Sequence, residues 1–167
     1  MTFSYYSKLN RLQKRSYDLS DEYSAIELEN SSYLYPYTRR LAAVLSAGDR
    51  LAVISTCQYI SDFITDGLGL PAVTIRVLET RPSDDWYELH GYYIPQGLEG
   101  ELTITLWMKT AQRKQVVAFK TFLRTLLHEL CHHIDYELLE LEDSFHTEGF
   151  YQRESSLFHQ IVEPLLK

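Results

Sequence analysis

The sequence contains little cysteine, with two residues, Cys57 and Cys131, in a chain of 167. Two thiols cannot build the multi-bridge framework that holds small secreted domains together. Long apolar runs are also missing, since no stretch approaches the roughly 20 apolar residues of a membrane span. The first residues, MTFSYYSKLNR, lack the apolar segment of a secretory signal. These absences predict a cytoplasmic protein with reduced thiols and no membrane partner.

Basic residues are also fewer than acidic residues. The chain has 16 Lys and Arg residues against 23 Asp and Glu residues, which gives a formal net charge of −7. An acidic surface repels phosphate backbones, so nucleic acid is not expected as a partner. Residues 8–15 (KLNRLQKR) are the best candidate for a local basic patch, although the preferred interpretation is a solvated helix face.

What the sequence does contain is enough apolar surface for a packed core. Hydrophobic residues make up 45% of the chain and aromatic residues 13%. A length of 167 residues favours a single domain over residues 1–167. Within it we expect a helical N-terminal part, residues 1–70, followed by a core of strands and helices, residues 71–167. The predicted fold class is therefore α+β.

Residues 5–68 are expected to be helical. In LAAVLSAGDRLAVISTCQYISDFI the apolar positions recur at three- and four-residue steps, which is the period of a helix with one buried face. Ser20 and Asp21 are predicted to cap one helix, and Pro36 to open another. The glycines and the proline of residues 67–71 then end the helical run.

Strand signals begin the second half of the chain. Alternating and aromatic-rich segments predict three strands, and a periodic apolar pattern predicts two helices after them. The expected strands are 72–78, 86–94 and 101–108, and the expected helices are 116–140 and one from near Thr147 towards Leu166. Together they predict a small, mostly antiparallel three-stranded sheet packed on the first of these helices and on a C-terminal helix.

The helix expected over residues 116–140 has two chemically different faces. At about 100° per residue, one arc is apolar. Its members are Val116, Phe119, Leu123, Leu126, Leu127, Leu130, Ile134 and Leu138. His128 and His132 project from the opposite side, beside polar residues. Histidines needed only for packing would sit within the apolar arc, so the pattern indicates imidazoles that serve a site.

Residues 128–132 read HELCH and match the HExxH motif. Residues four apart lie one turn apart on the same helix face, so two imidazoles can bind one ion. Glu129 points about 100° away, beside the open position of the metal, where it can accept a proton from water. We therefore predict a Zn²⁺ site with His128 and His132 as ligands and Glu129 as the catalytic general base.

The third ligand is chosen by its position. Thr147 is the expected N-cap of the last helix, which places His146 just before the first turn and lets its side chain point back at the preceding helix. Glu148 and Glu154 are rivals, since a carboxylate third ligand is equally good zinc chemistry. The remaining alternatives are carboxylates of the spacer, such as Glu140 and Glu142.

HELCHH followed by HTEGF at residues 146–150 resembles the SprT-like metallopeptidases. These proteins combine HExxH with a later H-x-x-x-F element at a helix start, and the histidine of that element is the third zinc ligand. The order of strands, then GYYIPQGLEGELTITLW, then the motif helix is also similar to the zincin core, over about residues 72–160. Thr147 stands where the family usually has glycine or proline. The ImmA/IrrE-type peptidases are a second family with a similar HExxH motif.

The resemblance implies a zinc-dependent peptidase with a zincin-like catalytic core over residues 71–167. It implies His128, His132 and His146 as metal ligands and Glu129 as the base that activates water. In such proteins the strand nearest the cleft pairs with an extended peptide, so the implied partner is a peptide or protein substrate. The helical start of the chain is not implied by the resemblance.

A function from another class is the alternative: a metal-stabilised binding or regulatory module with little or no turnover. In that case the N-terminal helices would perform the recognition. A purely structural zinc site would require four protein ligands, and only three stand out in this sequence. A retained base beside three ligands therefore favours the enzyme.

Further residues near the motif are candidates for supporting roles. Tyr151 and Arg153 follow the proposed third ligand and are candidate stabilisers of the transition-state oxyanion. Asp135 could orient a ligand imidazole through its other nitrogen, although a solvated carboxylate is the preferred interpretation. Gly91, in the predicted strand 86–94, either lets a substrate main chain approach or relieves a bend. Cys131 is expected to be a small buried thiol, and His90 and His159 ordinary polar residues. His133 is expected to be a polar surface group or a support for a ligand rather than a ligand itself.

Overall fold

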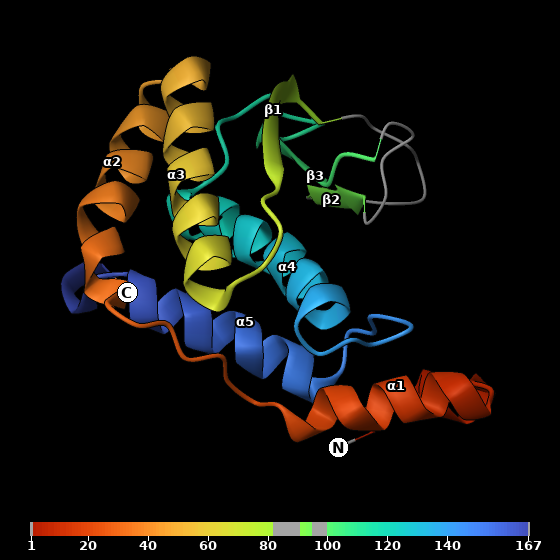
Figure 1. The fold of residues 1–167 in the computed structure, drawn as a ribbon. Coiled ribbons are helices and arrows are strands. Elements are labelled where there is room, and N and C mark those ends of the chain that lie inside the picture. Colours follow the sequence, from red (N-terminus) through yellow and green to blue (C-terminus); the bar gives the residue numbers. More distant parts are fainter. Residues whose placement is uncertain (1, 82–90, 95–99, 167) are drawn as a thin grey trace.

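The computed structural model describes residues 2–81, 91–94 and 100–166 of the chain. In this part of the chain the fold contains five α-helices and one three-stranded sheet, which is the α+β architecture that the sequence predicts (Figure 1). Among the same residues, the helices are too short or too polar for any of them to cross a membrane.

Three helices form the first part of the chain: α1 (Arg11–Glu22), α2 (Tyr35–Ser46) and α3 (Arg50–Leu68). Pro36 lies in the first turn of α2, and Gly69, with a φ of 68°, closes α3, so both of these predicted boundaries are confirmed. The prediction that Ser20 and Asp21 cap the start of a local helix is wrong, because both lie in the last turn of α1. Asn10 is the N-cap of α1, and its side chain accepts a main-chain N–H of the first turn.

The strands form one mixed sheet: β1 (Thr74–Thr80), β2 (Gly91–Ile94) and β3 (Thr103–Lys109). β3 is central, and it pairs in parallel with β1 and antiparallel with β2. The predicted mostly antiparallel sheet is therefore wrong for the β1–β3 pairing. Because β2 reverses the chain and lies at the edge, β3 returns in the direction of β1 and pairs with both strands. Of the strand predicted at 86–94, residues 86–90 lie outside the described residues.

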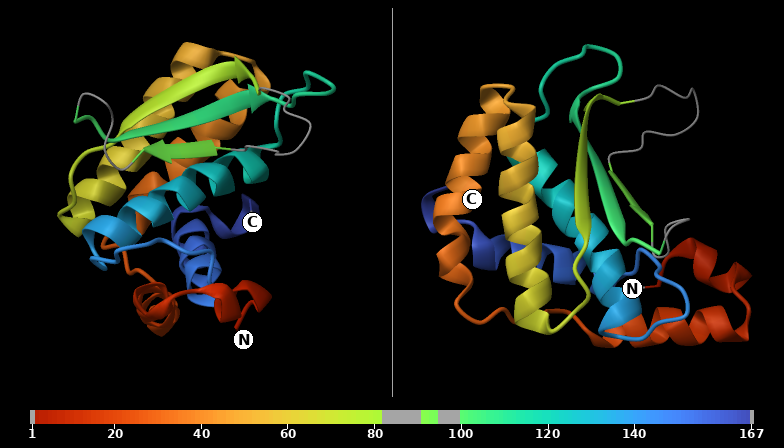
Figure 2. Two further views of the ribbon diagram at one scale, coloured as in Figure 1. Left: turned by 90° about the vertical axis from the view of Figure 1, so that its right-hand side faces the viewer. Right: turned by 45° about the horizontal axis from the view of Figure 1, so that its top comes forward.

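The candidate site is carried by α4 (Phe119–Glu137) and α5 (Glu148–Ile161). The sheet, α4, α5 and α1 follow one another in layers, with β2 next to α4 and α1 on the far side of α5 (Figure 2). α4 is shorter at both ends than the predicted helix. Val116 and Leu138 lie beyond its ends and are 38% and 39% exposed, so they do not belong to the buried arc. α5 likewise ends before the predicted limit at Leu166.

Apolar residues from both halves of the chain pack in the same core. Leu41 of α2 and Ile60 of α3 are fully buried in one cluster with Leu106 of β3, Leu126 of α4 and Leu157 of α5. The N-terminal helices thus stabilise the sheet and the two site-bearing helices directly, because burial of each such side chain contributes about 1.5–3 kcal/mol.

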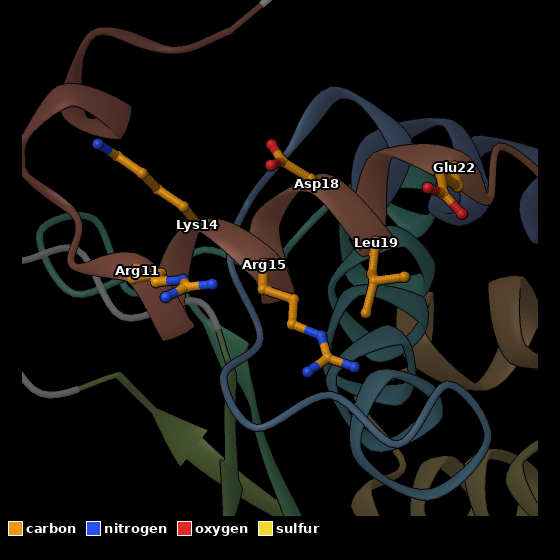
Figure 3. A pocket seen from close by; sticks show the side chains of 6 residues that line it. All are labelled: Arg11, Lys14, Arg15, Asp18, Leu19 and Glu22. Carbon is orange, nitrogen blue, oxygen red and sulfur yellow. The ribbon is translucent and has the colours of Figure 1, made fainter.

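α1 has one buried face and one open face. Ser16, Tyr17 and Ser20 are buried against the rest of the molecule. The opposite face lines a hollow of about 610 Å³ (Figure 3). The residues of this open face are Arg11, Lys14, Arg15, Asp18, Leu19 and Glu22. Acidic and basic side chains share this face. The segment 8–15 therefore contributes to a solvated helix face of mixed charge, which is the interpretation that the sequence favoured over a basic patch.

Candidate metal centre

Three imidazoles converge beside α4. His128 and His132 lie one turn apart on α4, and His146 lies just before α5, whose N-cap is Thr147 as predicted. The Nε2 atom of His146 lies 2.9 Å from Nε2 of His128 and 3.1 Å from Nε2 of His132. One ring nitrogen of each histidine lies within 4.8 Å of the others. The fold therefore brings together the three residues that the sequence predicts as ligands.

The geometry and the protonation of this cluster fit a tetrahedral zinc site. Zn–N bonds of about 2.0–2.1 Å place two ligand nitrogens about 3.3–3.4 Å apart, close to the separations found between these rings. Imidazoles must also be neutral to bind a metal. Burial and the neighbouring histidines lower the pKa of His132 to about 3. Partial burial and His128 lower the pKa of His146. The imidazoles of His132 and His146 are therefore uncharged at neutral pH and able to act as metal ligands.

Phe150 packs against all three imidazoles from one side. Its side chain is fully buried. Its ring centroid lies 4.9 Å from that of His128, 4.8 Å from that of His132 and 5.1 Å from that of His146. A single aromatic ring therefore restricts the orientation of all three ligands and excludes water from that side. Phe150 is the last residue of the HTEGF stretch, and no local pattern in the sequence indicates its contact with the three imidazoles.

Glu154 contacts His128 on the nitrogen that faces away from the cluster. Its Oε2 atom lies 3.1 Å from Nδ1 of His128, and its Oε1 atom accepts a hydrogen bond from Arg124. A carboxylate at Nδ1 fixes the ring N–H there and leaves Nε2 free to bind a metal. In the described part of the chain, the metal-binding group consists of the three histidines and contains none of the rival carboxylates: Glu140, Glu142, Glu148 and Glu154.

His132 is held through a hydroxyl group. Its Nδ1 atom lies 2.7 Å from Oγ of Ser144, and Ser144 donates its hydroxyl proton to Oδ2 of Asp135 at 2.7 Å. Asp135 is fully buried, so the preferred expectation of a solvated carboxylate is wrong. It lies behind the imidazole of His132 with Ser144 between them, which is an indirect form of the alternative in which Asp135 orients a ligand ring. Ser144 was missed from the sequence because nothing in the local pattern separates it from an ordinary loop serine.

Arg153 does not face the cluster, so its predicted role as an oxyanion stabiliser is wrong. The side chain is fully buried, and its Nη2 atom lies 2.7 Å from Oδ1 of Asp135. Nη1 donates to the carbonyl oxygens of Ser20 and Tyr23 at the end of α1, and Nη2 also donates to the hydroxyl oxygen of Ser20. A guanidinium group with these partners cannot also reach a substrate carbonyl, because its planar fork has a fixed geometry.

Glu129 is a buried carboxylate beside the cluster. Only 7% of the residue is exposed, and this burial raises the pKa of its carboxyl group to about 7, against lowering contributions from His128 and from a main-chain hydrogen bond of Tyr93. A carboxyl group with a pKa near neutrality can both accept and release a proton at working pH. The position and the pKa therefore suit the predicted general base.

β2 runs beside Glu129 at the edge of the sheet. In the described part of the chain it pairs with β3 on one side only. Gly91 of β2 lies so close to α4 that a Cβ atom there would overlap Glu129 and Thr125. The glycine therefore faces α4, and neither the predicted approach of a substrate main chain nor a simple bend explains it.

Tyr93 and His133 join the edge strand to α4. Nε2 of His133 lies 2.9 Å from the carbonyl oxygen of Pro71, which can only accept, so Nε2 carries the proton. Burial lowers the pKa of His133 and keeps the ring neutral, which leaves Nδ1 as an acceptor. The hydroxyl group of Tyr93, 2.9 Å away, therefore donates to Nδ1. His133 is fully buried with both nitrogens bonded, so the expectation of a polar surface group is wrong.

Tyr151 is the candidate oxyanion stabiliser that faces the cluster. It is 46% exposed, and its ring centroid lies 6.3 Å from that of His128 and 5.9 Å from that of His146. Partial burial raises the pKa of its phenol, so the group stays a protonated hydrogen-bond donor. Of the residues expected to have ordinary roles, Cys131 is a fully buried thiol and His159 bonds its own helix at Ser155. His90 lies outside the described residues.

Comparisons of the chain with models of known protein families, with curated proteins and with solved structures gave no match. The function of the histidine cluster must therefore follow from its own geometry and chemistry. Any function must explain three converging imidazoles, a buried carboxyl group next to His128 and an edge strand beside that carboxyl group.

Proposed function

We propose that the protein is a zinc-dependent metallopeptidase, similar to the SprT-like family, with His128, His132 and His146 as ligands. The observation that carries this proposal is Glu129, a buried carboxyl group next to His128 that is not one of the metal-binding group. A structural zinc site uses four protein ligands, whereas three ligands with a separate base are the arrangement of a hydrolytic site.

The chemistry divides between a metal and the protein's own groups. A zinc ion held by three imidazoles supplies a Lewis acid that polarises a carbonyl group and lowers the pKa of water. Glu129 accepts the proton of the attacking water and delivers it to the leaving amine. Its pKa of about 7 suits both transfers. Tyr151 can donate a hydrogen bond to the oxyanion that develops on the substrate.

β2 provides a place for an extended peptide substrate. An edge strand has unpaired main-chain groups on one side, and a peptide can add to it as a further strand. Because the main chain of Tyr93 in β2 also bonds Glu129, a peptide added to this edge would lie next to the base. This arrangement supports an unfolded or extended protein segment as the class of substrate.

A metal-stabilised binding or regulatory module is the second candidate. The observation that favours it is the contact between the N-terminal segment and the proposed ligand segment, where the hydroxyl group of Tyr5 donates to the carbonyl oxygen of His146 at 3.0 Å. A metal that stabilises such contacts could serve recognition alone. A binding module would not depend on Glu129, because recognition requires no proton transfer.

The test compares wild type with Glu129→Gln. The amide cannot accept a proton, so hydrolysis of a broad library of peptides and unfolded proteins should fall by about 10²–10⁴-fold. Zinc content by elemental analysis should stay at one ion per chain. Glu142→Gln, at an exposed position of the spacer, is the matched control and should cleave like wild type. If wild type cleaves nothing and both forms bind one partner equally through residues 1–70, the peptidase proposal is rejected.

We propose the cytoplasm as the compartment. Both cysteines are free and buried, which is compatible with a reducing environment. Burial raises the pKa of the Cys57 thiol to about 12, so this group is unreactive at neutral pH. Secretion into an oxidising compartment would give these thiols no structural use.

A further inference from the structure

We infer that helix α1 is part of the metal site, and that Arg153 and Ser144 are positioning residues that connect α1 to His132. The inference rests on the proposed zinc site and gives the N-terminal helix a role in it. The connection is a series of buried and partly buried hydrogen bonds that runs from α1 through α5 and the loop before it to α4.

The direction of these hydrogen bonds defines which nitrogen of His132 carries a proton. Asp135 accepts on both of its oxygens, Oδ1 from Arg153 and Oδ2 from Ser144. Ser144 has a single hydroxyl proton, and it donates this proton to Asp135. Oγ of Ser144 must therefore accept from Nδ1–H of His132. The lone pair of Nε2 is then directed at the cluster, which is the state that a metal ligand needs.

α1 holds the other side of the same guanidinium group. Nη1 of Arg153 donates to the carbonyl oxygens of Ser20 and Tyr23, each at 2.6 Å, and Nη2 donates to Oγ of Ser20 at 2.9 Å. The side chain is fully buried, so water does not replace these partners. Lysine carries a compact ammonium group in place of the planar fork, so it cannot reach Asp135 and the end of α1 at once.

α1 and the residues before it also contact the segment that carries His146. Oδ1 of Asp21 accepts a hydrogen bond of 2.8 Å from the main-chain N–H of Gly149, in the first turn of α5. Gly149 packs directly on the carbonyl oxygen of Ser20, where a Cβ atom would overlap. Tyr5 donates to the carbonyl oxygen of His146. Two of the three ligands are therefore held from the N-terminal part of the chain.

The test is a double-mutant cycle on metal affinity in the full-length protein. Zinc affinity is measured by competition with a chromophoric chelator, and the visible absorption of the cobalt(II) form reports ligand geometry. Ser144→Ala should weaken zinc binding by about 10–100-fold and change the cobalt spectrum. Arg153→Lys should weaken zinc binding by about 10-fold when Ser144 is present, and by less than about 2-fold in the Ser144→Ala background. Ser144→Thr keeps the hydroxyl group and should restore most of the affinity.

The cycle separates positioning from general stability. Equal losses in both backgrounds, or wild-type affinity and spectrum in Arg153→Lys, would overturn the inference. If Arg153→Lys does not melt cooperatively, Ser20→Ala takes its place with the same criterion. Arg39→Lys, on the half-exposed side of α2, is the matched control and should change neither readout. If wild type binds neither zinc nor cobalt, the proposed site itself fails, which is a different result from failure of the cycle.

Discussion

Gly91 of β2 lies directly against Glu129 of α4. A Cβ atom at position 91 would lie 2.8 Å from Oε1 and 2.9 Å from Cγ of Glu129, and 2.8 Å from Cγ2 of Thr125. These separations are shorter than van der Waals contact, so glycine is what permits the edge strand to lie this close to the helix. The sequence suggested a substrate main chain or a bend as the reason for this glycine, whereas in the structure it lies against the side chains of Glu129 and Thr125.

Gly91→Ala should therefore impair catalysis without loss of the metal. The added methyl group must displace either the carboxylate of Glu129 or β2 itself. Misplacement of a catalytic group by about 1 Å costs on the order of 100-fold in rate, so kcat should fall by about 10–100-fold. Overpacking should also lower the free energy of unfolding by about 1–3 kcal/mol. Steady-state kinetics, zinc analysis and thermal melting measure the three effects.

Gly67→Ala is the matched control for this substitution. Gly67 lies within α3, and nothing lies within 4 Å of a Cβ atom built there. Alanine should stabilise the helix by about 1 kcal/mol and leave turnover unchanged. Wild-type turnover in Gly91→Ala would mean that Glu129 is not the base, or that its position tolerates the methyl group.

His146→Ala should lower zinc affinity by orders of magnitude, because it removes one of three converging nitrogens. Glu154→Ala should have an intermediate effect of about 10–100-fold, since Glu154 contacts Nδ1 of His128 and orients that ligand. Isothermal titration of the metal-free proteins with zinc measures both values.

Glu148→Ala is the control for the third ligand. Glu148 is exposed and lies outside the histidine cluster, so zinc affinity should equal that of wild type. A larger loss in Glu154→Ala than in His146→Ala would reverse the assignment. Glu154 would then be the ligand, and the likeness to the SprT-like family would lose its third-ligand histidine.

The ligands could be predicted from the sequence because their signals are local. His128 and His132 follow from helical spacing, and His146 follows from its place before the N-cap Thr147. The partners that hold these ligands could not be predicted in the same way. Ser20 is 133 positions from Arg153, and no periodicity or spacing rule connects two residues so far apart.

For the sheet, too, the sequence predicts the positions of strands but not their order. Strand composition located β1 and β3 to within a few residues, because alternating burial leaves a period of two in the sequence. The order of the strands depends on pairing between residues far apart in the sequence. β3 is central, and it pairs in parallel with a strand that precedes it by two in the chain. Local alternation contains no information on that choice.

Removal of the metal should lower the melting temperature without unfolding the protein at room temperature. The core of the helices and the sheet is built independently of the histidine cluster, so the metal-free chain should stay folded. A ligand that binds only the folded state at about 1,000 times its Kd stabilises that state by about 4 kcal/mol. Calorimetry before and after treatment with a chelator measures this shift. His132→Ala should melt at the same temperature with and without the chelator, and a chelator-dependent shift in that variant would place the metal elsewhere.

Tyr93→Phe should weaken both substrate binding and turnover. The hydroxyl group of Tyr93 donates to Nδ1 of His133, and its loss leaves a buried acceptor without a partner, at a cost of about 1–3 kcal/mol. The same residue bonds Glu129 through its main chain. Because β2 is at once the proposed substrate edge and a support of the base, KM should rise and kcat should fall, each by a few-fold, while zinc content stays unchanged.

Tyr33→Phe separates these effects from the general loss of a hydroxyl group. Tyr33 is 67% exposed and lies in a short 3₁₀ helix far along the chain from the site, so its variant should match wild type in kinetics and melting. If Tyr93→Phe melts earlier than wild type but keeps both KM and kcat, the bond to His133 contributes only to stability. The edge strand would then hold its position beside Glu129 through its pairing with β3 alone, and the substrate edge would not depend on the contact with α4.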